Sequence, residues 1–524
     1  MSETQISVPK ITANLTTAQV EVGNTPQKVL FVGPMISGTG VTGSLVENIN
    51  NEKQEDTLYG STSQIASAIR AFKKINPKVS VDAIGLINAT GATFTEFTIT
   101  FIGTAATEEG RIYLDAGGVK NGRFSYACVV GTTNTQIRDH FVSALNARPT
   151  SLFVAAAVST GGMTLTATCA GAQANALGVE VSGIVAGIRN AAGTDLTVVR
   201  TVTGATEPAT TATLDVIGTN RYQGIVWGFT DVTAPVTLLN DRFNVNYAIL
   251  DGVCFHAFCG SANDTITQLA LPLYNSQSLV VFCDKDIIDE NSYRGPAINE
   301  PWFDKTAQFA AVRALRLTDG ASVSQYLTSQ SGLDQFGGTA LASLPYFNTP
   351  FPNLSPPKSG RGWINMGSTI TGSGGSLLGI NSAGVVVSGE IVTTYKTDAA
   401  SNPDPTWKFL NAVDTMSNAR EYIVNNWRKR FAQSRLTTGA SVRGRSMVNR
   451  AMFKAYTISL FNDLTGPDFV LGVGGEDALE YFKQNLTVDI SMVSGTILTT
   501  MSFPLVVGLR TILATIRVSF TTEN

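Results

Sequence analysis

Runs of β-branched and small residues, interrupted by glycine, dominate this sequence and restrict the folds open to it. Of its 524 residues 49 are glycine, 15% are charged and 43% are hydrophobic. This apolar content excludes a disordered chain and is sufficient for large buried cores. At roughly 150 residues per domain, the length indicates about three or four domains.

Reactive side chains are scarce for a chain of this length. The sequence contains two histidines, His140 and His256, and five cysteines. An enzyme of this size usually shows a cluster of acids, bases or metal ligands, whereas a structural protein needs only edges, faces and arms that bind copies of itself. We therefore predict assembly rather than catalysis, with no catalytic residue, no cofactor and no metal.

Charge, cysteine usage and hydropathy exclude further classes. The formal net charge of −3 gives no general attraction to nucleic acid or to an anionic membrane. The odd number of scattered cysteines favours reduced, mostly buried thiols in a protein made in a cytoplasm. No secretory signal begins the sequence, and no window reaches the ~18 apolar residues of a membrane span. We expect neither a nucleic-acid partner nor membrane insertion.

The hydrophobic periodicity predicts an α/β framework with a β-rich insertion. A strand at 29–32, a helix from about Ser61 with Ser61 and Gln64 at capping-box spacing, and a strand at 79–84 form one β-loop-α-β unit. From about residue 92 to 202, short β-rich segments and one helix replace this pattern. An α/β pattern then resumes, with predicted helices over 238–245 and about 306–317 and a predicted strand over 385–395.

The second half of the chain contains the clearest helix and a β-rich end. Ile423, Trp427 and Phe431 lie at i, i+4 and i+8 and predict a helix over 415–432. Alternation from Leu486 and again from Ile512 predicts strands. The predicted fold is an α/β (α+β) core assembled from N- and C-terminal parts, with an inserted β-rich domain and extended terminal arms. The predicted divisions are 1–27 (N-terminal arm), 28–90 (first part of the core), 91–202 (insertion), 203–355 (second α/β portion) and 356–524 (C-terminal core domain ending in a strand or arm).

Both ends of the chain are candidate inter-subunit arms. An extended segment without a core of its own can pair its backbone with a neighbour's open sheet edge. The alternatives are a frayed tail or a terminal strand paired within the subunit. The arm candidates are Ile6, Val8, Ile11, Ile512, Ile516, Val518 and Phe520.

The segment Gly38-Thr-Gly40-Val-Thr-Gly43 matches a dinucleotide-binding pattern after a strand. In such a site the glycine loop runs directly into a helix whose N-terminus binds phosphate. No helical pattern begins at Gly43, and the next predicted helix waits until Ser61. We interpret the segment as a long flexible loop.

The cysteine-containing segments are interpreted as structural. Cys254, His256 and Cys259 are close in sequence, but residues 254 and 256 share one face of a strand while 259 lies on the other, and no fourth ligand is nearby. Cys283 stands at a strand end with no histidine tied to it, which disfavours a nucleophile. Buried strand residues are the favoured interpretation.

A single basic concentration lies at the end of the helix predicted over 415–432. Arg428, Lys429 and Arg430 lie there, with further arginines on either side. Nucleic-acid binding is the alternative, but the neighbouring aromatic residues lie on the apolar face of the helix rather than on a base-stacking surface. We favour a solvated face or a contact with another subunit.

Segments in order along the chain, from Phe31-Val-Gly-Pro34 to Ile391-Val-Thr-Thr-Tyr395 and Pro403-Asp404, resemble those of one family, the contractile phage tail sheath proteins of the Mu-like group. The most specific element is Ile391-Val-Thr-Thr-Tyr395 followed by Pro403-Asp404. The resemblance covers most of the chain in order, and further segments that carry it are Phe31-Val-Gly-Pro34, Leu58-Tyr-Gly60-Ser61, Phe97–Thr104, Ala144–Ala147, Leu165–Thr168, Tyr222–Asp231, Pro350–Leu354 and Leu377–Ile380.

The resemblance implies a structural virion protein. Sheath subunits form stacked hexameric rings around a tail tube, and contraction drives the tube through the host envelope without a nucleotide or metal. The implied partners are further copies of the chain, the tube protein, and baseplate and tail terminator proteins. The implied location is the virion tail, after synthesis in the host cytoplasm. The alternatives are another self-assembling tail component, such as a tube or baseplate part, and a nucleotide-binding α/β enzyme that uses the loop at 38–43.

Overall fold

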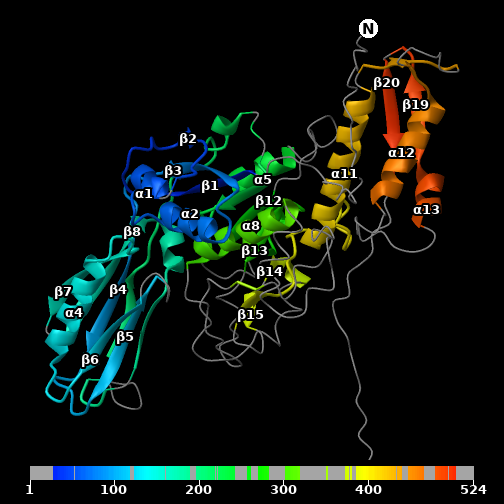
Figure 1. Ribbon diagram of the computed structural model, residues 1–524. Helices are drawn as coiled ribbons and strands as arrows, with labels where there is room; N and C mark the ends of the chain where they lie inside the picture. Colours follow the sequence, from blue (N-terminus) through cyan, green and yellow to red (C-terminus); the bar gives the residue numbers. More distant parts are fainter. Residues whose placement is uncertain are drawn as a thin grey trace, which may run out of the picture.

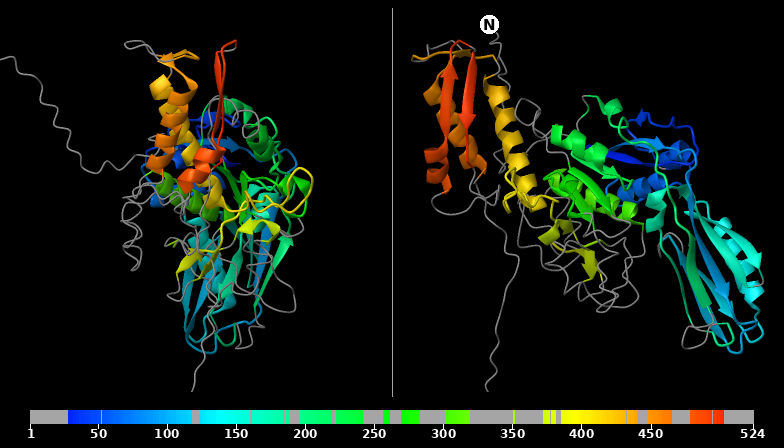
Figure 2. Two further views of the ribbon diagram at one scale, coloured as in Figure 1. Left: turned by 90° about the vertical axis from the view of Figure 1, so that its right-hand side faces the viewer. Right: turned by 180° about the vertical axis from the view of Figure 1, so that it is seen from behind.

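The computed structural model describes much of the chain as a mixed α/β protein with several sheets (Figure 1). The predicted α/β class is confirmed. The β-rich insertion and the helices at the C-terminal end lie at opposite ends of the largest sheet (Figures 1 and 2). With short gaps at 52, 160, 184, 189–195, 219, 221, 377, 432 and 494, the structure describes residues 28–117, 123–241, 256–260, 269–282, 301–318, 350–351, 372–380, 385–439, 447–464 and 478–502.

A seven-stranded sheet organises the first core. Its order is β14-β13-β12-β11-β1-β3-β2, and every described pairing is parallel except that of β2 with β3. The central strands are continuous apolar runs because both faces are covered. The strands are β1 (Lys28–Pro34), β2 (Leu45–Val46), β3 (Ser80–Leu86), β11 (Gly224–Trp227), β12 (His256–Gly260), β13 (Leu279–Phe282) and β14 (Gly375–Ser376).

Two helices, α2 (Gln64–Ile75) and α8 (Trp302–Thr318), lie side by side against this sheet (Figure 1). α8 begins earlier than the predicted 306, so that Trp302 and Phe303 lie within its first turn. The ring of Phe31 in β1 meets Phe72 at 5.5 Å and Phe303 at 6.4 Å between centroids. A shorter helix, α5 (Thr233–Asp241), contacts β12, and it begins before the predicted 238.

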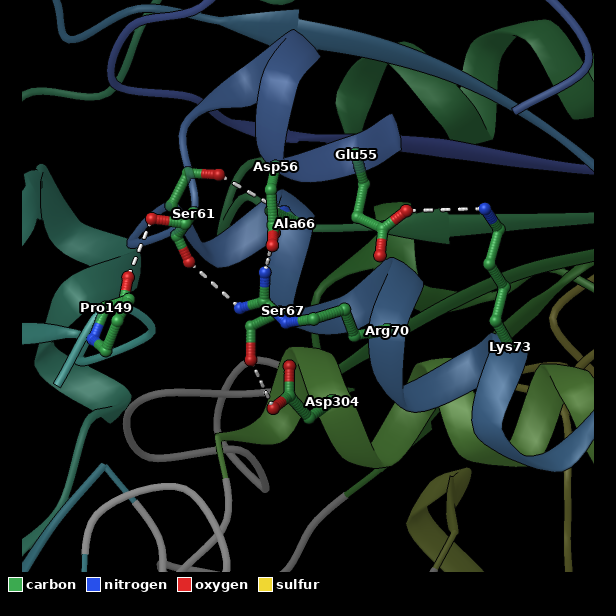
Figure 3. Close-up of polar contacts among 10 residues, drawn as sticks. Glu55, Asp56, Ser61, Ala66, Ser67, Arg70, Lys73, Pro149 and Asp304 are labelled. Atoms are coloured by element: carbon green, nitrogen blue, oxygen red, sulfur yellow. Dashed lines mark hydrogen bonds and ion pairs between the residues drawn. The ribbon is translucent and has the colours of Figure 1, made fainter. Parts of the chain in front are cut away.

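The predicted helix start at Ser61 is wrong by two residues. Ser63 is the N-cap of α2, and its hydroxyl accepts a hydrogen bond from the Ala66 N–H at 3.2 Å. The Ser61 hydroxyl instead donates to the Pro149 carbonyl at 2.6 Å, which joins this turn to the β-rich insertion (Figure 3). The pattern failed because three cap-forming residues, at positions 61 to 63, follow one another.

Polar contacts hold α2 to its surroundings (Figure 3). The Ser67 hydroxyl donates to the buried Asp304 carboxylate of α8 at 2.8 Å. The Lys73 ammonium pairs at 3.3 Å with Glu55, which lies in α1 (Gln54–Tyr59). The sequence pattern did not predict α1, because six residues are too short to display a helical period.

The β-rich insertion forms two sheets around a second core. One sheet has the order β10-β4-β8-β7 and the other β6-β5-β9. Helix α4 (Asn134–Asn146) packs along β7 and β6, and Thr133 and Gln136 form its capping box. The strands are β4 (Phe94–Phe101), β5 (Gly110–Ala116), β6 (Arg123–Cys128), β7 (Phe153–Ser159), β8 (Gly162–Ala170), β9 (Val179–Ser182) and β10 (Leu196–Val202).

The last described part of the chain forms a third core that begins at Ile423 of helix α11 (Leu410–Phe431), and we call the described residues of 423–502 the C-terminal module. This helix begins five residues before the predicted start. Two further helices, α12 (Arg450–Leu464) and α13 (Ala478–Asn485), were not predicted. The predicted strand at the end is β19 (Thr487–Ser491), which forms an antiparallel hairpin with β20 (Thr496–Thr500).

Short elements complete the described residues. The predicted strand over 385–395 is reduced to β16 (Val386–Ser388), after which Val392 forms an isolated bridge with Phe409. The remaining elements are β15 (Leu378–Ile380), β17 (Arg435–Leu436), β18 (Met447–Val448) and short 3-10 helices at Ala172–Ala176, Asp215–Ile217 and Pro272–Tyr274.

Candidate assembly surfaces

The predicted basic triplet, Arg428, Lys429 and Arg430, lies exposed in the last turn of α11. The apolar stripe of the same helix faces inward: Ile423 is fully buried, and the Trp427 indole N–H donates to the Thr457 hydroxyl at 3.0 Å. Cations at a helix C-terminus also compensate the helix dipole. The helix therefore separates a packed aromatic face from a charged face.

One arginine of the triplet packs on α12, and two further arginines lie near the triplet. The Arg430 guanidinium lies 4.9 Å from the ring centre of Tyr456 on α12. Exposed Arg435 lies in β17, beside β18 and the start of α12. Arg450 opens α12 and pairs with Asp489 of the hairpin at 3.2 Å. This end of the C-terminal module therefore presents a basic surface built from helices and a strand.

The hairpin of β19 and β20 has one packed face and one open face. Val488 is buried against the module, whereas Asp489 is exposed. On β20 the side chain of Leu498 is 71% exposed. In the described part of the chain this sheet has only two strands. A two-stranded hairpin is marginally stable alone, so its packing on α12 is essential to it.

The predicted arm residues lie outside the described residues. This holds for Ile6, Val8 and Ile11 at the start of the chain and for the C-terminal candidates Ile512, Ile516, Val518 and Phe520. The described residues do fix the two points where these segments begin. Residue 28 opens β1 in the middle of the large sheet, and residue 502 follows the hairpin strand β20.

The glycines at 38 and 40 serve packing in this structure. A Cβ added at Gly38 would lie 2.2 Å from the carbonyl oxygen of Leu58, and one added at Gly40 would lie 2.8 Å from the same atom. The backbone N–H of Gly40 donates to this carbonyl at 3.0 Å. The loop therefore folds against the end of α1 rather than opening a helix in the manner of a dinucleotide site.

The cysteine and histidine segment forms part of a buried strand. His256 and Cys259 lie in β12 and are buried, while Cys254 and Cys283 lie outside the described residues. Burial raises the pKa of the Cys259 thiol to about 12, which disfavours a thiolate ligand or nucleophile. Within the described ranges, no three His, Cys, Asp or Glu side chains group to hold a metal ion.

Sequence reasoning missed the partners of His256. Its Nδ1 lies 3.3 Å from Nη2 of Arg313, and the same guanidinium binds the Asp414 carboxylate. Arg313 and Asp414 are 101 residues apart, so no local pattern signals the pair.

None of the helices in the described residues has both the length and the apolar character that a membrane span requires.

One known protein is similar to this chain along most of its length. No family model matches the chain. A curated relative, the Mu-like prophage FluMu tail sheath protein of Haemophilus influenzae, is 22% identical over 469 residues, which cover 88% of this chain and 86% of the relative. The predicted resemblance is confirmed. The chain is similar along most of its length to a Mu-like tail sheath protein, and this similarity supports a structural role in a tail sheath.

Solved structures of sheath proteins are also similar to the chain. The sheath tail protein of Desulfitobacterium hafniense is 11% identical, with 93% of this chain and 95% of that chain covered and a TM-score of 0.45. A sheath tail protein of Listeria innocua is 11% identical, with 92% of both chains covered and a TM-score of 0.44. The function proposed below rests on the sequence similarity to the tail sheath relative.

Proposed function

We propose that this chain polymerises as stacked hexameric rings around a tail tube and contracts to drive the tube through a host envelope. The observation that carries the proposal is the similarity to a prophage tail sheath protein along 88% of the chain. The sparse histidines and low charge agree with a protein that works through subunit packing. The subunits would be made in the host cytoplasm and reside in the virion tail.

The hairpin of β19 and β20 is the proposed receptor for the arms of neighbouring subunits. It offers an extended sheet of two strands whose outer face exposes Leu498. Added strands would continue the backbone hydrogen-bond ladder, and this pairing tolerates many side chains. The arms would then keep the lattice connected while the subunits slide and rotate during contraction.

The basic triplet is the proposed contact with the tube or with an adjacent subunit. Its side chains are exposed at the end of a helix that is anchored in two cores. An acidic surface would complement this charge, and the contact would weaken as salt screens it. Baseplate and tail terminator proteins would bind the two ends of the assembled sheath.

We also propose that the divisions predicted from the sequence correspond to assembly units. Residues 28–90 and 203–355 would form the framework, residues 91–202 an insertion, and residues 356–524 the C-terminal core domain with its arm. The segment 1–27 would be the second arm. Separate buried clusters support the insertion and the C-terminal module as units. The cluster under the large sheet also contains Leu378, Val386 and Leu410, so the framework would include the first part of the last division.

Electron microscopy of purified protein tests the sheath proposal. We expect long hollow striated tubes from the full-length chain, and discrete particles from a variant that lacks residues 1–20 and 505–524. If full-length protein alone stays discrete, assembly in the presence of the tube protein decides the matter. Discrete particles in that experiment too would reject the sheath proposal.

A matched pair of substitutions tests the arm residues individually. In an extended strand, Ile516 and Thr515 point to opposite faces. We expect Ile516→Asp to prevent tube formation and Thr515→Asp to permit it, because only the first places a charge on the proposed packed face. Equal assembly by the two variants would contradict the assignment of the apolar face as the one that docks.

Charge reversal tests the basic triplet. The double substitution Arg428→Glu and Lys429→Glu should abolish co-sedimentation of sheath with tube or, if the contact joins subunits, tube formation itself. The control is Arg111→Glu, an exposed arginine of the β-rich insertion, far from the C-terminal module (Figures 1 and 2). Unchanged assembly of the triplet variant at low salt would show that these residues form only a solvated face.

A further inference from the structure

Helix α11 belongs to two cores at once. Leu410, at its first residue, is fully buried in the cluster under the large sheet, and Ile423 is fully buried in the cluster of the C-terminal module. Its 22 residues span roughly 33 Å at about 1.5 Å per residue. Figures 1 and 2 show α11 as the helix between the sheet and the pair α12 and α13. The helix is therefore a stiff connection between the two cores.

A buried ion pair fixes the first turns of α11. Arg313 of α8 donates to the Asp414 carboxylate through Nε at 3.0 Å and through Nη2 at 2.6 Å. The side chains are 5% and 1% exposed. This is a bidentate pair in which two parallel hydrogen bonds define the relative orientation of the guanidinium and the carboxylate.

Contacts with the sheet fix the guanidinium in turn. Its Nη1 donates to the Gln223 carbonyl, just before β11, at 2.8 Å. Its Nη2 lies 3.3 Å from Nδ1 of His256 on β12, and its carbon lies 5.5 Å from the ring centre of Phe258. Asp414 therefore binds a group that α8, β11 and β12 hold in place together.

Directional contacts at the base of a long helix have a large effect at its far end. Apolar contacts such as those of Leu410 permit small rotations, because dispersion forces have little directionality. A planar ion pair does not permit them without losing a hydrogen bond in a buried site. Sixteen residues separate Asp414 from Arg430, which corresponds to roughly 24 Å, so a tilt of about 10° would move the basic triplet by about 4 Å.

We propose that the Arg313–Asp414 pair sets the angle of α11 and thereby positions the C-terminal module relative to the large sheet. Both residues are positioning residues, since they act on the hairpin and the basic triplet only through the helix. The proposal concerns the isolated subunit, and it rests on the proposed sheath function only for its consequence: a subunit with a mis-set α11 would place its docking surfaces out of register with its neighbours.

The test is a distance distribution between two spin labels on the full-length subunit. One label replaces Leu271, exposed beside the large sheet, and the other replaces Tyr481, exposed on α13. A keto amino acid at each position avoids the native cysteines. The variants are Asp414→Asn, which keeps the shape and removes the charge, and Arg313→Lys, which keeps the charge and removes the fork. The control is Ser67→Ala, which removes another buried contact to α8 but none to α11.

We expect one narrow distance distribution for the native protein and for Ser67→Ala. Each ion-pair variant should shift or broaden the distribution by about 4 Å or more while thermal unfolding stays cooperative. Native distances in an ion-pair variant with lowered stability would overturn the proposal, because the pair would then serve stability alone. If Asp414→Asn fails to fold, Arg313→Lys decides the question. The distances are measured on the isolated subunit and do not depend on tube formation. If the chain proved not to form a sheath, the proposal about the ion pair would still be tested by these distances.

Discussion

The β-rich insertion and the hairpin of the C-terminal module differ in the contacts made by their edge strands. In the insertion, the edge strand β7 is closed by a side chain of α4: the Asn146 amide donates to the Ala155 carbonyl at 2.8 Å and accepts from its N–H at 2.9 Å. The hairpin of β19 and β20 is a sheet of only two strands in the described part of the chain. Exposed sheet edges are aggregation hazards, and this is one reason why the hairpin is the proposed receptor for a neighbour's arm.

Removing a large aromatic residue from each region gives the largest expected effect and tests the contrast directly. Phe141 of α4 is buried against Phe101, and Phe482 of α13 stacks on Phe461 at 3.9 Å. Phe141→Ala and Phe482→Ala should each destabilise their own region by about 3–5 kcal/mol. Thermal unfolding measures this loss. Electron microscopy should show that only Phe482→Ala abolishes tubes. Loss of tubes with Phe141→Ala alone would reverse the assignment of the two regions.

Removing the side chain that covers the edge of β7 should give the next largest effect. Asn146→Ala removes both hydrogen bonds to Ala155, and we expect a loss of about 1 kcal/mol per bond. The newly open edge of β7 should also promote association through this strand. Denaturant unfolding measures the first effect and light scattering the second. Asn146→Asp, which keeps one acceptor and adds charge at the edge, should destabilise the protein without promoting association.

The two regions also differ in how much the sequence predicted. Strands of the insertion and β19 alternate apolar and polar residues, because each has one packed face, and this period is visible without the fold. α12 was missed because its buried Phe453, Leu460 and Phe461 do not leave a clean polar face: Met452 is exposed and Ile458 is half-buried. A helix whose apolar residues are shared among several neighbours has no single stripe to detect.

The candidate surfaces were predicted to the extent that they are local. The basic triplet is a short run in the sequence and is exposed in the structure. The Arg313–Asp414 pair was invisible because tertiary folding alone brings α8 and α11 together. The short helix α1 was missed because its six residues are too few to display a helical period, although Glu55 and Tyr59, at i and i+4, are both buried.

A substitution on the open hairpin should have a small effect on the subunit and a larger one on assembly. Leu498 is exposed, so Leu498→Lys should change the free energy of unfolding by less than about 0.5 kcal/mol. A lysine on an edge strand opposes the addition of another strand. Tube formation should therefore fall in microscopy while thermal unfolding stays native. Normal tubes from this variant would show that the exposed face of β20 is not part of the docking surface.

The smallest expected effect tests how the insertion returns to the large sheet. Glu207 lies in the returning segment, and its carboxylate accepts from the backbone N–H groups of Thr230 and Asp231 at 3.0 and 3.3 Å. Burial raises the pKa of Glu207, and these hydrogen bonds only partly offset the effect. The folded state then binds the proton more tightly than the unfolded state.

The sign of the pH dependence follows from this difference. The contribution of Glu207 to stability is greatest below the ordinary glutamate pKa of about 4.3 and declines as pH rises through the raised folded value. Glu207→Gln keeps an acceptor for the Thr230 N–H but cannot titrate. Urea unfolding at a series of pH values from 4 to 7 should therefore show a steeper decline in the native protein than in the variant. Parallel profiles would mean that the charge of Glu207 does not affect the stability of this junction.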